Sequence, residues 1–342
     1  MSEPRPEGSN APLVEVRRLV HRYPVGRGWL GGPRGYLNAV DDVSFRVWKG
    51  ETLGLVGETG SGKTTLGRCL VRLLTPASGE ILFEGEDLLA LKGEALRRKR
   101  RDFQIIFQDP YGSLNPRMRV ESIVTEPLAI HRMGDRRQRR LRATNLLEQV
   151  GMEASALPRF PHEFSGGQRQ RIGIARALAL NPKFVICDEP VSALDVSVQA
   201  QIINLLQDLQ ERLGLTYLFI AHGLQVVAHI STRVAVMFQG RIVEMGCREE
   251  LFQRPLHPYT RSLLDAVLDP DPGVPRPAHQ GPPAEPAAAP SPAPGCRFAP
   301  RCPIAEACCR EEEPALRELA PGHTVACHLA DRPSAGDSKA EA

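Results

Sequence analysis

The chain has 342 residues, of which 43 are basic and 40 acidic, so its formal net charge is only +3. That length accommodates one large domain with an appendage, and the balanced charge argues against a dedicated nucleic-acid binder. Its apolar runs fall far short of the roughly 20 residues of a membrane helix, and the polar stretch 1–12 lacks the apolar core of a signal peptide. We therefore expect a cytoplasmic protein whose eight cysteines are reduced or bound to metal.

The first half of the chain predicts alternating strands and helices. Val43–Val47 alternates like a half-buried strand, and Thr52–Val56 is a strand that runs directly into a glycine-rich loop. Lys63–Leu74 continues from this loop as a helix. The region Ala95–Phe164 is rich in Arg, Leu and Glu, and we expect it to be mostly helical.

The second half predicts a buried sheet. Phe184–Asp188 and Tyr217–Ala221 are short apolar strands typical of a parallel sheet. Between them, Val198–Leu213 carries leucine and isoleucine at helical spacing. Val234–Phe238 and Arg241–Glu244 flank a Gln-Gly pair and predict a hairpin.

These elements divide the chain into four parts. Residues 13–258 are predicted to form one α/β domain. Residues 259–295 hold a short helix and a proline-rich linker, and residues 296–330 form a compact cysteine-rich module. Residues 331–342 are expected to be disordered.

The segment 57–64 matches the phosphate-binding P-loop in full. Its glycines let backbone amides turn toward phosphate oxygens, Lys63 adds a positive charge near the β and γ phosphates, and the Thr64 hydroxyl is a ligand for Mg²⁺. The helix that follows adds a favourable dipole. The residues predicted here to bind ATP are Gly57, Glu58, Thr59, Gly60, Ser61, Gly62, Lys63, Thr64 and Thr65.

Two acids follow an apolar strand further along the chain. Asp188 emerges at the carboxyl end of this strand, where nucleotides bind in such sheets, and is predicted to hold Mg²⁺ through water. Glu189 comes one residue later and is the candidate to orient or deprotonate the attacking water.

A third motif lies between the loop and the acids. Ser165 can cap the helix that runs toward Leu178, and Gly166 and Gly167 expose backbone amides, so the start of this helix is an anion site. The motif that we name the signature segment comprises Ser165, Gly166, Gly167 and Gln168.

Together these motifs resemble the nucleotide-binding subunits of ABC transporters, over nearly the whole chain. The resemblance implies a P-loop NTPase fold with a RecA-like core, an antiparallel β subdomain and an α-helical subdomain. It also implies that two ATP molecules are buried between two head-to-tail domains, each facing the signature segment of the opposite subunit. ATP closes such a dimer and hydrolysis reopens it, which is a ligand-driven population shift.

The resemblance assigns further roles. Gln108 would touch Mg²⁺ and the attacking water, Asp195 matches the D-loop, and His222 matches the switch histidine that contacts the γ-phosphate. The neighbours of His222 depart from the common Ser-His-Asp, because Ala221 and Gly223 flank it here; the resemblance therefore allows altered turnover at this site.

The aromatic residue that stacks on adenine is best matched by Tyr23. Trp29 and Tyr36 in the following glycine-rich insertion are the alternatives, because stacking requires only a flat ring.

A narrower similarity concerns the ATPases of oligopeptide and dipeptide importers, among which the chain resembles the second of two ATPase subunits. It rests on residues 108–118, 188–197 and 257–260 and on the cysteine tail. It implies peptide import, with a second, different ATPase subunit, two membrane permeases and an extracytoplasmic peptide-binding protein as partners, and no nucleic acid. The chain would then sit on the cytoplasmic face of the cell membrane.

Other functions stay open from the sequence. Importers of nickel or glutathione share much of this pattern. A soluble ABC ATPase acting on DNA or ribosomes, and a nucleotide sensor without transport, are the alternatives from other classes.

The C-terminal cysteines suggest a metal centre. Five, six and seventeen residues separate the four, which lack the paired Cys-x-x-Cys spacing of common zinc sites and are Cys296, Cys302, Cys309 and Cys327. The resembled importers carry such a tail, for which an iron–sulfur cluster of the 4Fe-4S type is the favoured occupant; zinc and reduced thiols are the alternatives. The other cysteines expected to pack in the ATPase domain are Cys69, Cys187 and Cys247.

Overall fold

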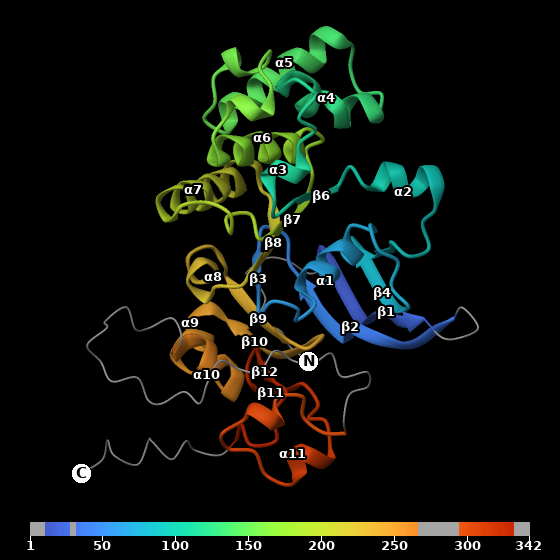
Figure 1. Ribbon diagram of the computed structural model, residues 1–342, viewed down its shortest axis with the longest axis vertical. Helices are drawn as coiled ribbons and strands as arrows, with labels where there is room; N and C mark the ends of the chain where they lie inside the picture. Colours follow the sequence, from blue (N-terminus) through green and yellow to red (C-terminus); the bar gives the residue numbers. More distant parts are fainter. Residues whose placement is uncertain (1–10, 28–31, 266–293, 332–342) are drawn as a thin grey trace.

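The computed structural model describes residues 11–27, 32–265 and 294–331, and these fold around two sheets (Figure 1). The smaller sheet is antiparallel, with the strand order β2-β1-β4-β5. Its strands are β1 (Val14–Arg27), β2 (Pro33–Val47), β4 (Ser78–Phe83) and β5 (Glu86–Asp87). The predicted strand 43–47 is therefore only the end of β2, because β2 pairs with β1 over most of its length.

The larger sheet has the order β11-β12-β10-β9-β3-β8-β7-β6. Five neighbouring strands are parallel, namely β6 (Phe103–Ile106), β7 (Phe184–Asp188), β8 (Thr216–Ala221), β3 (Thr52–Val56) and β9 (Arg233–Phe238). Three antiparallel strands extend it, namely β10 (Arg241–Cys247), β12 (His323–Val325) and β11 (Arg317–Ala320). The hairpin of β9 and β10 is as predicted.

Helices cover this larger sheet and form a separate layer at one end of the molecule, where α4, α5 and α6 gather (Figure 1). The longer helices are α1 (Lys63–Leu70), α2 (Gly93–Lys99), α4 (Val120–Ile130), α5 (Arg136–Gln149), α6 (Gly166–Leu178), α7 (Val196–Leu213), α8 (Leu224–Ile230), α9 (Arg248–Gln253) and α10 (Pro258–Asp265). The short ones are α3 (Pro110–Ser113), α11 (Cys308–Glu311) and the 3₁₀ turns η1 (Ala154–Ala156), η2 (Pro161–Glu163) and η3 (Ala299–Arg301). No helix among the described residues is both long enough and apolar enough to cross a membrane.

The apolar strands are buried on both faces because successive side chains point to opposite sides of a sheet. Phe184 and Ile186 of β7 join the core that faces α1, whereas Val185 and Cys187 join the core beneath the helical layer. This double burial explains why these strands are continuous apolar runs rather than alternating ones.

Two predictions for the first half need correction. The helix α1 ends at Leu70 rather than Leu74, and Arg72 in the following turn has φ 57°, which a helix cannot accommodate. The region 95–164 is mostly helical, yet it contains β6, which pairs with β7 at the edge of the parallel sheet. Local propensity did not reveal this strand because its partner lies far away in sequence.

The cysteine-rich segment continues the larger sheet. Its strand β12 pairs with β10, with Val325 opposite Glu244 and Thr324 opposite Met245. The side chain of His323 lies 2.7 Å from the buried carboxylate of Glu244. The segment is therefore attached to the ATPase part by a sheet and a buried polar contact, whereas the predicted linker and tail lie largely outside the described residues.

Candidate nucleotide site

The loop 57–64 is held open by glycines that have no substitute. It joins β3 to α1, and Gly57 and Gly62 have φ of 155° and 104°. A Cβ atom at these positions would lie 2.1 Å from the carbonyl oxygen of Met237 and 1.9 Å from that of Ala39. Positive φ and backbone contact together require glycine at both positions.

Two side-chain donors of the loop have only loop carbonyls as acceptors, or have no acceptor, among the described residues. Nζ of Lys63 donates to the carbonyl oxygens of Gly57 (2.7 Å) and Glu58 (2.9 Å), and burial lowers the pKa of this lysine. The hydroxyl of Ser61 is buried without a hydrogen-bond partner among the described residues, and Gly62 gives α1 no side-chain cap. An anion such as a triphosphate would satisfy these groups.

Oxygen atoms converge beside the loop. Oγ1 of Thr64 donates to Oδ1 of Asp188 at 2.8 Å, and burial raises the pKa of this carboxyl group. Hydroxyl and carboxylate oxygens are ligands that Mg²⁺ prefers. Thr64 and Asp188 therefore fit the predicted magnesium site in both chemistry and placement.

Glu189 is at the centre of a second cluster. Its Oε2 accepts a hydrogen bond from Nε2 of Gln108 at 2.8 Å and lies 3.9 Å from Nδ1 of His222. Glu189 has φ 46°, a left-handed conformation that residues other than glycine rarely adopt. Such strained residues often lie at functional sites. The structure thus brings together all three residues that the sequence assigned to hydrolysis, at the carboxyl ends of β6, β7 and β8.

Tyr23 lies next to the start of α1. Its hydroxyl is 3.4 Å from Oγ1 of Thr65, and the residue is 37% exposed, with His21 packed against its ring at 4.8 Å between ring centroids. Tyr36 is more exposed, at 55%, and lies opposite Pro24 in the pairing of β1 with β2. Trp29 lies outside the described residues.

The signature segment begins α6, and Ser165 and Gln168 within it cap each other's backbone amides. Ser165 is the N-cap, and the amide of Gln168 donates to its hydroxyl at 3.4 Å while the amide of Ser165 donates to Oε1 of Gln168 at 3.0 Å. Asp195 caps the neighbouring α7 without a side-chain hydrogen bond. Within the described residues, no hydrogen bond or ion pair joins the signature segment to the loop 57–64 of the same chain.

Two residues at this site escaped the sequence reasoning. The hydroxyl of Tyr259 accepts a hydrogen bond from the amide of Glu58 at 2.8 Å, and Arg301 forms two hydrogen bonds to the carboxylate of Glu58. Tyr259 belongs to a motif that resembles the peptide importers, but nothing in its sequence context indicated a contact with the loop. Arg301 carried no signal at all.

The four C-terminal cysteines line one small cavity. They surround it together with His257 and His328, and burial raises the pKa of Cys296, Cys302 and Cys327. In the part of the chain that the structure describes, however, no three His, Cys, Asp or Glu side chains are arranged to hold a metal ion. All eight cysteines are free, and Cys69 and Cys187 are buried as expected, whereas Cys247 is half-buried.

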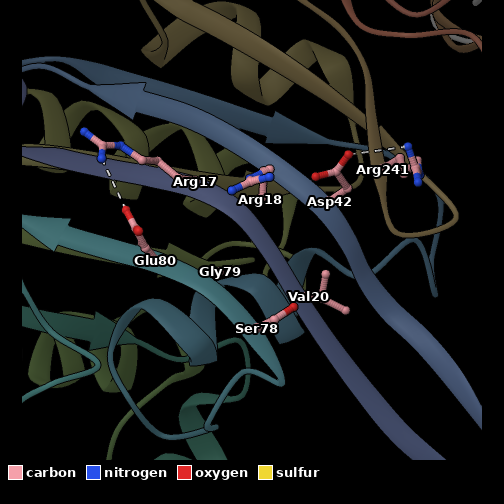
Figure 2. Close-up of a pocket in the computed structure, with 8 residues that line it drawn as sticks. All are labelled: Arg17, Arg18, Val20, Asp42, Ser78, Gly79, Glu80 and Arg241. Atoms are coloured by element: carbon pink, nitrogen blue, oxygen red, sulfur yellow. Dashed lines mark hydrogen bonds and ion pairs between the residues drawn. The ribbon is translucent and has the colours of Figure 1, made fainter.

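A hollow of about 700 Å³ lies elsewhere, at the antiparallel sheet (Figure 2). Arginines line it, but Arg17 is 3.2 Å from Glu80 and Arg241 is 3.9 Å from Asp42. This hollow contains none of the residues predicted to bind nucleotide.

Comparison with known proteins agrees with this geometry. Residues 40–192 match the family described as ABC transporter, and residues 243–309 match the family described as oligopeptide/dipeptide transporter, C-terminal region. The oligopeptide transport ATP-binding protein AppF of Bacillus subtilis is 50% identical over 322 residues, covering 93% of this chain and 97% of the relative. A probable peptide ABC transporter ATP-binding protein of Sinorhizobium fredii, y4tS, is 51% identical over 322 residues, covering 93% of this chain and 90% of the relative.

Solved structures show the same fold. A dimeric post-hydrolysis state of the ATP-binding cassette MJ0796, bound to ADP and Pi, superposes with a TM-score of 0.61 at 28% identity, covering 69% of this chain and 98% of the cassette. The cbiO1 protein of Clostridium perfringens, part of the ABC transporter complex cbiONQ, gives the same TM-score and identity over 71% of this chain and 91% of its own length.

Proposed function

The chain belongs to the ATP-binding subunits of ABC transporters of the oligopeptide/dipeptide type, and we propose that it hydrolyses ATP with the groups assembled beside the loop 57–64 to drive peptide import. The observation that carries this proposal is the meeting of two clusters at one edge of the larger sheet. Thr64 contacts Asp188 at 2.8 Å, and Gln108 contacts Glu189 at 2.8 Å.

Binding begins with the phosphates. Lys63 exchanges the two loop carbonyls for phosphate oxygens, and backbone amides of the glycine-rich loop would donate to the same phosphates. Ser61 gains an acceptor for its buried hydroxyl. Tyr23, which is partly exposed, stacks on the adenine.

Mg²⁺ would be held by Thr64, Asp188 and Gln108, and when bound it neutralises charge on the phosphates. Glu189 then orients a water for attack on the γ-phosphorus and accepts the proton that this water loses, so that ATP and water become ADP and phosphate. Gln108 fixes the Glu189 carboxylate, and His222 is close enough to reach the γ-phosphate when the site closes. Ala221 and Gly223 give His222 no side-chain hydrogen bond, which leaves Glu189 as the dominant group.

The signature segment and Asp195 serve a second subunit. Because the signature segment has no link to the loop of its own chain, it is free to face the nucleotide of a partner. We propose that a different ATPase subunit forms the other half of the ATP-binding dimer, and that the dimer lies at the cytoplasmic face of the membrane. Its closure and opening move two membrane permeases, and an extracytoplasmic binding protein delivers the peptide.

The cysteine cavity is the proposed site of a 4Fe-4S cluster. Support comes from the four thiols that line one cavity, since thiolates are the usual ligands of such clusters. Within the described residues these thiols are not arranged to hold a metal ion, so the proposal rests on the four cysteines that share the cavity. Absorbance near 400 nm in anaerobically purified protein tests this; a colourless protein with one bound zinc contradicts it.

The function is tested in proteoliposomes that contain the whole transporter. ATP-dependent uptake of a labelled peptide is expected with the wild-type chain and should be lost with Lys63→Ala, which removes the buried ammonium group. Uptake of nickel or glutathione in place of peptide would contradict the cargo, and failure of the chain to co-purify with two permeases would contradict transport itself.

A further inference from the structure

Glu58, the second residue of the phosphate loop, forms hydrogen bonds with residues from the C-terminal part of the chain. Nη1 and Nη2 of Arg301 donate to its two carboxylate oxygens at 2.9 and 2.7 Å. Its backbone amide donates to the hydroxyl of Tyr259 at 2.8 Å. Both the side chain and the backbone of this residue are therefore fixed by groups that come from far along the sequence.

The loop that carries Arg301 is itself anchored. Phe298 packs against both Phe238 and Tyr259, with its ring centroid 5.5 Å from each of theirs, and it is only 4% exposed. The guanidinium of Arg301 lies 5.7 Å from the ring of Phe238 and 5.6 Å from that of Phe298. Aromatic faces on one side and a carboxylate on the other restrict the side chain to one orientation.

These contacts continue through Glu58 to Lys63, the central lysine of the site. The carbonyl oxygen of Glu58 accepts a hydrogen bond from Nζ of Lys63 at 2.9 Å, and the carbonyl of Gly57 accepts another at 2.7 Å. A chain of contacts therefore runs from Arg301 through Glu58 to Lys63. A movement of Glu58 therefore displaces one of the two carbonyls that orient the ammonium group before phosphate oxygens replace them.

We propose that Arg301, from the cysteine-rich module, and Tyr259, from α10, are positioning residues for the phosphate loop and together set the affinity of the site for ATP. Neither residue touches the nucleotide; they hold Glu58 so that the amides after it and Lys63 keep their binding geometry. This inference rests on the proposed function, since it concerns the same site.

A positioning role differs from an ordinary surface ion pair in what it changes. The pair is about one-third exposed at both partners, so removing it should leave the unfolding temperature almost unchanged. If Arg301 forms only a surface ion pair, the affinity for nucleotide should also be unchanged when Arg301 is replaced. If it orders the loop before binding, the dissociation constant for ATP should rise, because the loop must then be ordered at the moment of binding.

The test is an equilibrium titration of the full chain with a fluorescent ATP analogue and Mg²⁺. We expect Arg301→Ala to raise the dissociation constant about twofold to fivefold. Arg301→Lys should recover part of this loss, since an ammonium group keeps the charge but not the paired hydrogen bonds. Arg310→Ala is the matched control, because it removes the same charge from the exposed helix α11 of the same module.

A second set of variants changes Tyr259 and Glu58, the residue that Arg301 and Tyr259 both contact. Tyr259→Phe keeps the ring but leaves the Glu58 amide without its acceptor, and should raise the dissociation constant about fivefold. In a Glu58→Gln background, Arg301→Ala should have almost no further effect. A wild-type chain that binds no analogue contradicts the proposed function, whereas equal affinity of wild type and Arg301→Ala, or full additivity with Glu58→Gln, overturns the positioning role alone.

Discussion

Two helices of this chain begin with glycine-rich segments, and they begin in different ways. The loop before α1 gives its helix no side-chain cap, and Ser61 is buried without a partner among the described residues. The signature segment gives α6 a capping box made by Ser165 and Gln168. The first helix start therefore leaves a donor for a ligand to satisfy, whereas the second satisfies its own backbone groups.

The glycines differ in the same sense. At Gly62 an added Cβ would strike a backbone carbonyl at 1.9 Å, whereas at Gly166 it would lie 3.2 Å from a side-chain methyl group of Leu194. Backbone atoms cannot move aside, but a leucine side chain can. The backbone around the α1 start therefore excludes a side chain at Gly62, whereas at Gly166 only a leucine side chain is in the way, and at Gly167 the obstacle is Val198, 2.5 Å from the added Cβ.

The largest effect should come from Glu189→Gln on the α1 side. Removing the base should lower ATP turnover of the assembled transporter about 100-fold or more and leave ATP binding intact, with the dimer trapped closed. Turnover is measured with the partner subunit's site inactivated. Glu250→Gln, on the exposed surface of α9, is the control. If Glu189→Gln turns over ATP at the wild-type rate, Glu189 is not the catalytic base.

Gly62→Ala should show that the α1 start is fixed by the fold. The clash with Ala39 and the φ of 104° should destabilise the chain by about 3 kcal/mol and abolish ATP binding. Thermal unfolding and nucleotide titration measure both effects. Gly214→Ala has φ 64° but no atom within 4 Å of the new Cβ, so it isolates the conformational cost of about 1 kcal/mol.

Gly166→Ala should separate the two helix starts. The free energy of unfolding of the isolated chain should change by less than about 0.5 kcal/mol, and its nucleotide affinity should not change. Turnover of the assembled transporter should fall about tenfold if, as proposed, the signature segment faces the partner's nucleotide, because the added methyl group would then stand against its phosphate. Weakened ATP binding by the isolated variant would break the comparison.

An effect on stability that depends on pH concerns Asp188. Because burial raises its pKa above the ordinary 3.8, the ionised carboxylate costs stability in the metal-free chain at neutral pH. Asp188→Asn should therefore raise the free energy of unfolding by about 1 kcal/mol near pH 7 while abolishing hydrolysis. This gain should shrink as the pH falls through the raised pKa of the folded chain and vanish below 3.8, where the wild-type carboxyl is protonated in both states; a gain that is constant with pH would contradict it.

Much of the site follows from contiguous residues. The bounds of β3 and β7, the Ser165 cap and the glycine loop were all predicted, because each depends on side chains and backbone angles within a few positions of one another. The grouping of Gln108, Glu189 and His222 was implied by family resemblance, and the structure places them together.

What the sequence by itself determined is therefore the chemistry: a phosphate loop, two acids at a strand end and a helix start that faces outward. Only the tertiary structure decided how the C-terminal segment takes part. The pairing of β12 with β10 and the contact of Arg301 with Glu58, 243 positions apart, depend on the chain closing on itself. Local patterns cannot encode such contacts, because neither partner carries a signal until the fold brings the two together.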